Sequence, residues 1–138
     1  MSGSMQVLTF EDRAILDYPA VRRALLTIYT PDEVSEVITT RPPLPMSRIQ
    51  VSPKDAPPFS AILAADGSAC GMDGLPWQNN PVVVALRAQI PPDAGRIFAI
   101  DLMHVENFAE LAPGLTLAQL ESSWRPLAEL EDPRDPPR

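Results

Sequence analysis

Only a few side chains in this sequence could take part in covalent or acid–base chemistry, and they centre on Cys70 and His104. These are the single cysteine and the single histidine among 138 residues. A cysteine nucleophile needs a neighbouring base to take its proton. A Cys70–His104 pair, with Asp101 or Asp73 orienting the imidazole, is therefore the available catalytic arrangement. A lone cysteine beside a glycine is more often a small buried residue. A small Cys/His enzyme is thus an alternative hypothesis and not the leading one.

Other catalytic, metal and phosphate sites are not indicated. A zinc site would require Cys70, His104 and carboxylates to converge without the paired ligand spacing that zinc sites show, so we expect no metal and no cofactor. Gly67, Gly71 and Gly74 lack the spacing and the following lysine of a phosphate-binding loop. The basic residues are scattered and form no stripe with aromatic residues, which argues against nucleic-acid binding. The sequence therefore favours binding over catalysis.

The loop predicted at residues 70–80 is the segment most typical of a binding site, because it is rich in Gly, Asn and Pro between two apolar segments. Trp77 lies within it, and tryptophan is a preferred anchor residue in protein interfaces. The alternative is that Trp77 folds back and covers the core. The residues predicted to contact a partner are Met72, Asp73, Leu75 and Trp77 as anchors, with Glu106 and Glu110 as charge partners.

The charge balance favours a protein partner. Eighteen Asp and Glu residues outnumber eleven Lys and Arg residues, which gives a formal net charge of −7 at pH 7. A surface of this sign repels nucleic acid and anionic membranes, and it can steer association with a more basic protein. Many soluble proteins are equally acidic, so the charge alone identifies no partner.

The apolar pattern predicts a protein outside the membrane. No apolar run approaches the ~20 residues of a membrane-spanning helix. The N-terminus lacks the basic and apolar regions of a secretion signal, and one cysteine excludes an internal disulfide framework. We therefore expect a cytoplasmic protein.

In size, acidity and mixed order of elements, the chain is similar to bacterial secretion chaperones and toxin-immunity proteins. No motif or residue carries this likeness, which rests on gross properties. It implies a non-catalytic module, immunity- or chaperone-like, that acts by surface complementarity to a more basic protein. A self-associating structural subunit, such as a homodimer joined through a strand edge or a helix, is a further alternative.

Residues 59–102 predict the central sheet. An apolar run at residues 59–65 ends at Asp66-Gly67, a pair favoured in two-residue hairpin turns. Residues 82–90 alternate with period two, and residues 96–102 contain further strand formers. We therefore predict an antiparallel meander with one buried face.

A helical alternative exists for residues 82–90. Asn80 followed by Pro81 is also a helix start, with asparagine as the N-cap and proline in the first turn. The apolar residues would then share one helical stripe. Three consecutive valines favour the strand, because valine has poor helix propensity and good strand propensity.

The N-terminal third predicts helices. Gln6 to Leu8 is expected to be a short extended lead-in, and Thr9 to cap a first helical turn. Residues 20–29 then show apolar residues at helical spacing. Thr30-Pro31-Asp32-Glu33 combines an N-cap, a first-position proline and a capping-box glutamate. The buried stripe of the helix that follows is predicted to be Val34, Val37 and Ile38.

Residues 41–58 carry six prolines, so they predict a rigid connector with at most one edge strand, at residues 47–51. A proline-rich segment can also bind an aromatic groove, but we favour the connector. Residues 107–112 predict a helical turn. A second capping box at Thr116–Gln119 predicts a C-terminal helix. The residues expected on one face of that helix are Leu117, Leu120 and Trp124.

The predicted organisation is a single α+β domain at residues 6–130. It has N-terminal helices, a four- to five-stranded, mainly antiparallel sheet, and a C-terminal helix packed on one sheet face. Residues 1–5 are interpreted as a cloning remnant that ends at a second methionine. Residues 131–138 are charged and rich in proline, so they predict a disordered tail.

Overall fold

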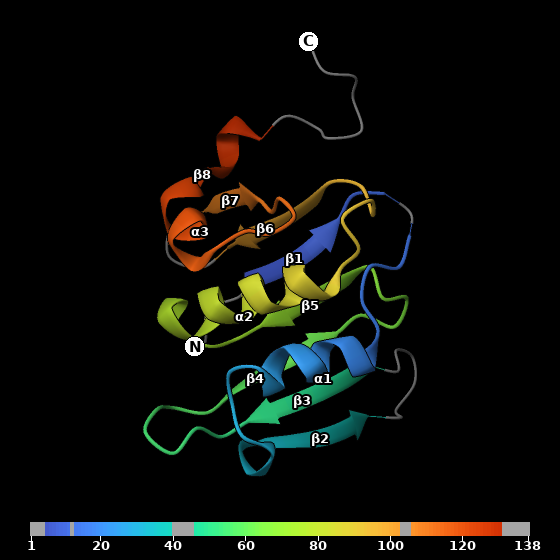
Figure 1. Ribbon diagram of the computed structural model, residues 1–138, viewed down its shortest axis with the longest axis vertical. Helices are drawn as coiled ribbons and strands as arrows, with labels where there is room; N and C mark the ends of the chain where they lie inside the picture. The colour runs from blue at the N-terminus through green and yellow to red at the C-terminus, as the bar shows by residue number, and fades with distance from the viewer. Residues whose placement is uncertain (1–4, 12, 40–45, 103–105, 131–138) are drawn as a thin grey trace.

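A computed structural model of the chain describes residues 5–11, 13–39, 46–102 and 106–130 (Figure 1). The fold class is α+β, as predicted, with three α-helices and an eight-stranded antiparallel sheet among these residues, rather than four or five strands. The strand order is β2-β3-β4-β5-β1-β6-β7-β8. The strands are β1 (Met5–Thr9), β2 (Val34–Thr39), β3 (Met46–Val51), β4 (Phe59–Leu63), β5 (Ala69–Met72), β6 (Ile97–Asp101), β7 (Asn107–Glu110) and β8 (Arg125–Pro126). The helices are α1 (Tyr18–Leu26), α2 (Pro76–Gln89) and α3 (Leu117–Ser123), with single 3₁₀ turns η1 (Pro31–Glu33) and η2 (Leu127–Glu129).

β1 lies at the centre of the sheet, although its sequence predicts only an extended lead-in. It pairs antiparallel with β5 on one side and with β6 on the other, so that Val7 lies opposite both Cys70 and Ala99. The side chains of β1 alternate between buried and half-buried, as expected for a strand with one face on the core. Met5 is 2% exposed and therefore belongs to the domain. Residues 1–4 lie outside the described residues.

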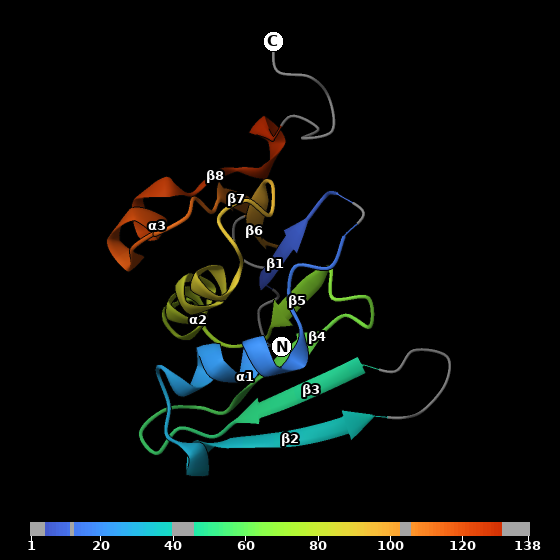
Figure 2. The ribbon, with the colours of Figure 1, turned by 45° about the vertical axis from the view of Figure 1, so that its right-hand side comes forward.

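The helices cover one face of the sheet (Figures 1 and 2). Since β5 and β6 both run antiparallel to β1, they are parallel to each other, and α2 is the crossover between them. In the same way α1 connects β1 to the parallel strand β2. The two crossover helices lie side by side, and α3 packs beside α2 near β7.

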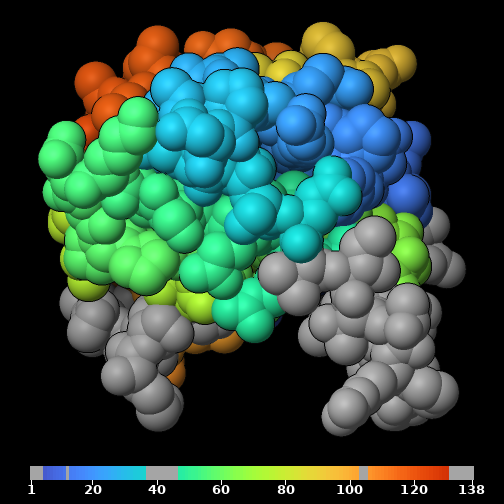
Figure 3. Space-filling model, turned by 90° about the horizontal axis from the view of Figure 1, so that it is seen from below, coloured from blue at the N-terminus to red at the C-terminus, as the bar shows by residue number. Residues whose placement is uncertain are grey.

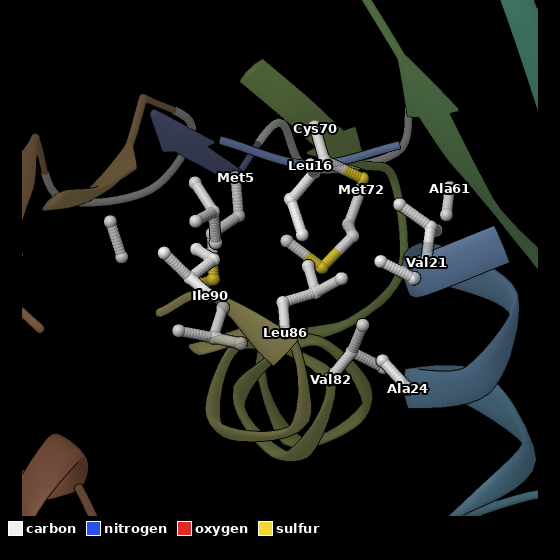
Figure 4. Close-up of a cluster of buried hydrophobic side chains, with 14 of the residues drawn as sticks. Met5, Leu16, Val21, Ala24, Ala61, Cys70, Met72, Val82, Leu86 and Ile90 are labelled. Carbon is white, nitrogen blue, oxygen red and sulfur yellow. The ribbon is translucent and has the colours of Figure 1, made fainter. Parts of the chain in front are cut away.

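The main core lies between the two crossover helices and the sheet (Figure 4). Met72 of β5 points toward Leu86 of α2, Met5 of β1 points toward Ile90 at the end of the same helix, and Val21 of α1 lies at the side of the cluster. Leu86 is fully buried. A smaller apolar cluster lies apart from this core, on β6 and β7 and under the C-terminal segment. Its members are Phe98, Ile100 and Phe108, with Leu8, Phe10, Leu127 and Leu130 packed against them.

The strand predicted at residues 82–90 is wrong, because this segment is the larger part of α2. Val82, Val83 and Leu86 are each 0% exposed, so all three are buried in the core. Burial of that stripe outweighs the poor helix propensity of valine, which is below about 1 kcal/mol per residue. The helical alternative is the correct one, but its N-cap is Leu75 instead of Asn80, and its first residue is Pro76 instead of Pro81.

Two predicted helical segments are strands. Val34, Val37 and Ile38 belong to β2, and residues 107–110 form β7. The capping box at Thr30 is present, but it starts only the single 3₁₀ turn η1. Thr9 ends β1 and caps no helix; its hydroxyl accepts a hydrogen bond from the Glu11 amide.

Residues 41–45 of the predicted proline-rich connector lie outside the described residues, and residues 46–51 of it form a strand. The strand predicted at residues 47–51 is present as β3, but it is no edge strand, since it pairs with both β2 and β4. The hairpin around Asp66-Gly67 is confirmed with a longer loop. Of the two predicted turn residues, only Gly67 has a left-handed φ, of +73°. The Gly67 amide donates to the Ala64 carbonyl. The hairpin therefore closes at the pair Ala64–Ala69.

The C-terminal helix is confirmed as α3, with Thr116 and Gln119 forming the predicted capping box. Leu120 is fully buried, whereas Leu117 is exposed and Trp124 is the C-cap, half-buried against the core. The predicted tail at residues 131–138 lies outside the described residues. In the described part of the chain, no helix has the length and apolar character needed to cross a membrane.

Candidate interaction surface

Two large apolar side chains stand exposed where β5 leads into α2. Trp77 is 59% exposed and Leu75 is 43% exposed. Trp77 therefore does not fold back onto the core. It lies in the first turn of α2 rather than in a loop, because the helix begins at Pro76. We call residues 73–77 the anchor segment.

Buried polar side chains hold the anchor segment in place. Asn79 binds the backbone of Gly74 twice: it accepts from the Gly74 amide at 3.1 Å and donates to the Gly74 carbonyl at 2.9 Å. Gln78 accepts from the Leu75 amide at 3.0 Å and donates to the Pro57 carbonyl at 2.7 Å. Both side chains are 2% exposed. Since these groups are buried and hydrogen-bonded, the backbone beneath Trp77 is rigid.

The supporting roles of Gln78 and Asn79 are not among the sequence predictions, although the sequence carries a signal for Gln78. Pro76 fits the first position of a helix, and Gln78 occupies the third position, where the glutamine of a capping box lies. That pattern would have placed the start of α2 correctly. The bidentate contact of Asn79 to Gly74 depends on a tertiary turn, which the sequence does not indicate.

Gly74 is the tightest point of the anchor segment. A Cβ atom added there would lie 2.7 Å from Asn79 Oδ1 and 3.1 Å from Phe59 Cγ. We predict that Gly74→Ala lowers the free energy of unfolding by about 1–3 kcal/mol, because the added carbon must displace a buried amide or ring.

A matched control for Gly74→Ala exists three residues earlier, at Gly71 in β5. A Cβ at Gly71 would meet nothing closer than 3.9 Å, so Gly71→Ala is expected to change stability by less than about 0.5 kcal/mol. Urea unfolding followed by circular dichroism measures both variants. Equal stability of the two would contradict the packing described at Gly74.

Three segments meet around the anchor segment at one end of the sheet. Tyr29, just after α1, packs edge-on against Phe59 at the start of β4, with ring centroids 5.8 Å apart. Pro57 of the β3–β4 loop is tied to Gln78, as described above. Ile28, beside Tyr29, is also exposed, at 39%. Exposed apolar side chains thus come from the anchor segment and from one of the three segments around it, the residues that follow α1.

The other residues predicted to contact a partner have different surroundings. Met72 is 2% exposed and belongs to the core, so it is not part of the surface. Asp73 is half-buried and its carboxylate accepts a hydrogen bond from the Ser60 amide. Its role is to join β4 to the anchor segment.

Glu106 and Glu110 lie away from the anchor segment. Glu106 directly precedes β7 and Glu110 is its last residue, and β7 is separated from β5 by β1 and β6. Glu110 forms a two-point ion pair with Arg96, with N–O distances of 2.8 and 3.1 Å, and this raises the pKa of the arginine. Glu106 is exposed. Contact of these two carboxylates with a partner stays a prediction.

Cys70 lies in the core of β5, where it is 0% exposed. Burial raises the pKa of its thiol to about 12, so the thiolate that a nucleophile requires does not form near neutral pH. Asp101 is half-buried at the end of β6, and β1 runs between it and β5. His104 lies outside the described residues. The structure therefore gives the Cys/His alternative no activated cysteine.

We predict that iodoacetamide modifies Cys70 in the native protein far more slowly at pH 7–8 than in urea. Folding stability should also fall as the pH rises above 9, because the folded-state pKa of about 12 exceeds the ordinary value of 9.0. The loss is up to about 1.4 kcal/mol per pH unit for one group. Cys70→Ala is expected to reduce this loss of stability with rising pH. Urea unfolding of both proteins at pH 8 and at pH 10 measures the difference. Rapid alkylation of the folded protein would contradict the buried thiol.

Among the described residues, no three His, Cys, Asp or Glu side chains are grouped so that they could hold a metal ion. Comparison with protein-family models, with curated proteins and with solved structures found no match.

Proposed function

We propose that this chain is a non-catalytic protein-binding module, acting by surface complementarity toward a more basic protein. The observation that carries the proposal is the exposure of Trp77 and Leu75 on a backbone fixed by buried hydrogen bonds. Interface energy concentrates in a few large anchors such as tryptophan, and a rigid anchor loses little conformational entropy when it binds. An exposed tryptophan held in this way contributes little to folding stability and can contribute strongly to binding.

The charge of the chain supports the second part of the proposal. A net charge of −7 favours approach by proteins of opposite charge and disfavours nucleic acid. An immunity- or chaperone-like role in the cytoplasm, in which the module occupies a surface of a toxin or a secreted protein, is the specific form that we propose. Steering of this kind predicts an association rate that falls as salt is added.

Site-specific photo-crosslinking in the cells from which the sequence comes tests the proposal. A photoreactive phenylalanine at position 77 is expected to give one discrete covalent adduct, whose yield falls when Leu75→Ala is added. The matched control places the same residue at Ala88, which is exposed near the far end of α2. The captured protein should have a basic isoelectric point. Equal adducts from both positions, or none from position 77, would refute the assignment.

A further inference from the structure

The two edges of the sheet differ in how they are protected against pairing with another strand. β8 forms one edge; it has only two residues, and one of them is Pro126, which has no amide hydrogen to donate. β2 forms the other edge, with six residues that include no proline, glycine or lysine. Short length, proline, lysine and inward-pointing charges are among the devices that keep an edge from pairing. β2 has none of the first three, and its one charged residue, Glu36, is paired with Arg22 of α1.

The backbone groups that β2 directs outward follow from its pairing with β3. The Ser52 amide donates to the Glu33 carbonyl at 2.8 Å, and the register continues with Val34 opposite Val51. Hydrogen-bonding residues alternate along an antiparallel pair. The amide and carbonyl of Glu36 and of Ile38 therefore point away from β3, toward the edge.

Two of the three carboxylates at residues 32–36 are paired with cations of the chain, and the third, that of Glu33, accepts hydrogen bonds from the Thr30 and Lys54 amides. Arg22 Nε lies 3.9 Å from Glu36 Oε1, and Lys54 Nζ lies 3.5 Å from Asp32 Oδ2. Figure 3 looks onto the β2 side of the molecule, where η1 and α1 form much of the surface. Exposed ion pairs add little to folding stability, but they bring the net charge near the edge closer to zero. Two copies of this chain, each with a charge of −7, would repel each other least where cations balance acids.

From these observations we infer that β2 pairs antiparallel with β2 of a second copy, across a two-fold axis perpendicular to the sheet. An edge of this kind is complementary to itself under a two-fold axis. The register that we assign places Val37 opposite its own copy and Glu36 opposite Ile38. The neighbouring register, which is centred on Glu36, places two carboxylates opposite each other and is disfavoured. The result is one continuous sheet with the helices of both copies on the same face.

Sedimentation velocity over a concentration series tests whether the full chain self-associates. We expect the mass to rise from one chain to two. Glu36→Pro removes the outward amide hydrogen of residue 36 and no hydrogen bond to β3, so it should give a monomer at all concentrations. Glu36→Gln removes the charge but keeps the amide, and it should still dimerise. Urea unfolding checks that both variants fold.

Amide hydrogen exchange of the unmodified protein provides a test that does not depend on a variant. The amides of Glu36 and Ile38 should exchange at least about tenfold more slowly at concentrations where the dimer forms, whereas Ser35 and Val37 should be protected at every concentration. A protein that stays monomeric would overturn the inference. So would a dimer with unchanged exchange at residues 36 and 38, or one that Trp77→Ala abolishes. The first two results leave the proposed binding by the anchor segment unaffected, whereas the third would assign the anchor segment to self-association.

Discussion

Trp77→Ala is expected to weaken binding of the crosslinked partner by at least about 30-fold, which corresponds to the ~2 kcal/mol of an interface hot spot. Trp77 is 59% exposed, so it contributes little to the core. The free energy of unfolding should therefore stay within about 0.5 kcal/mol of the unchanged protein. Isothermal titration with the purified partner and urea unfolding measure the two quantities separately.

The matched control for Trp77 is Leu117→Ala. Leu117 is a large apolar residue, 39% exposed, and it lies on α3 outside the anchor segment. Its replacement should leave the affinity unchanged within about twofold. Trp77→Phe, which keeps an aromatic ring, should recover part of the loss. Unchanged affinity of Trp77→Ala, or equal losses for Trp77→Ala and Leu117→Ala, would remove the anchor segment from the proposed function.

Arg87→Ala is expected to lower the free energy of unfolding by about 3–5 kcal/mol, because two charge-assisted hydrogen bonds in the core are lost together. Arg87 is 2% exposed, and its guanidinium donates to the Leu111 and Ile90 carbonyls at 2.9 Å each. Hydrogen bonds from a charged donor contribute about 1.5–3 kcal/mol each, and the truncation leaves both carbonyls without that donor. Burial lowers the pKa of Arg87, but arginine stays protonated in proteins.

Two further variants show which part of the loss in Arg87→Ala comes from the buried hydrogen bonds. Arg87→Met keeps the aliphatic volume and removes the cost of burying a charge, so about half of the loss should remain, from the two unpaired carbonyls. Arg23→Ala removes an exposed helical arginine that donates to Gln89, and it should change stability by less than about 0.5 kcal/mol. Urea unfolding by circular dichroism measures all three. If Arg87→Ala lost no more than Arg23→Ala, the buried contacts would not contribute to stability.

The parts of the fold that the sequence predicts correctly are those with one unambiguous local pattern. α1 and α3 have apolar residues at helical spacing, and Thr116 supplies a cap for α3. β4 and β6 are apolar runs bounded by turn residues. In these segments local preference and burial agree, so the sequence is sufficient.

The wrong predictions arise where the apolar residues fit both a helical repeat and a strand alternation, so that tertiary contacts decide between helix and strand. In β2, Val34 and Val37 fit a helical stripe, because Glu36 interrupts the alternation that a strand would show. An edge strand tolerates that carboxylate, which stays exposed beside Arg22. In α2, three valines favour a strand locally, but a crossover between two parallel strands is usually a helix that covers the sheet.

The candidate surface could be predicted only in part. Tryptophan in a glycine-rich segment indicates an anchor, and the sequence selects Trp77 and Leu75 for this reason. It could not predict that Met72 faces inward, because that depends on the register of β5 against β1, in which Met72 lies opposite Met5. The exposure of Trp77 depends likewise on where α2 begins.

The central position of β1 has a consequence for how the chain is made. Met5 pairs with Met72 and with Asp101, which follow it by 67 and 96 residues (72 − 5 and 101 − 5). β1 is the only strand that joins the block β2–β5 to the block β6–β8 among the described residues. A ribosome therefore synthesises the joining strand first and both of its neighbours much later. Such distant pairings are slow to form, so the nascent chain must keep an apolar strand from aggregating until its last partner emerges.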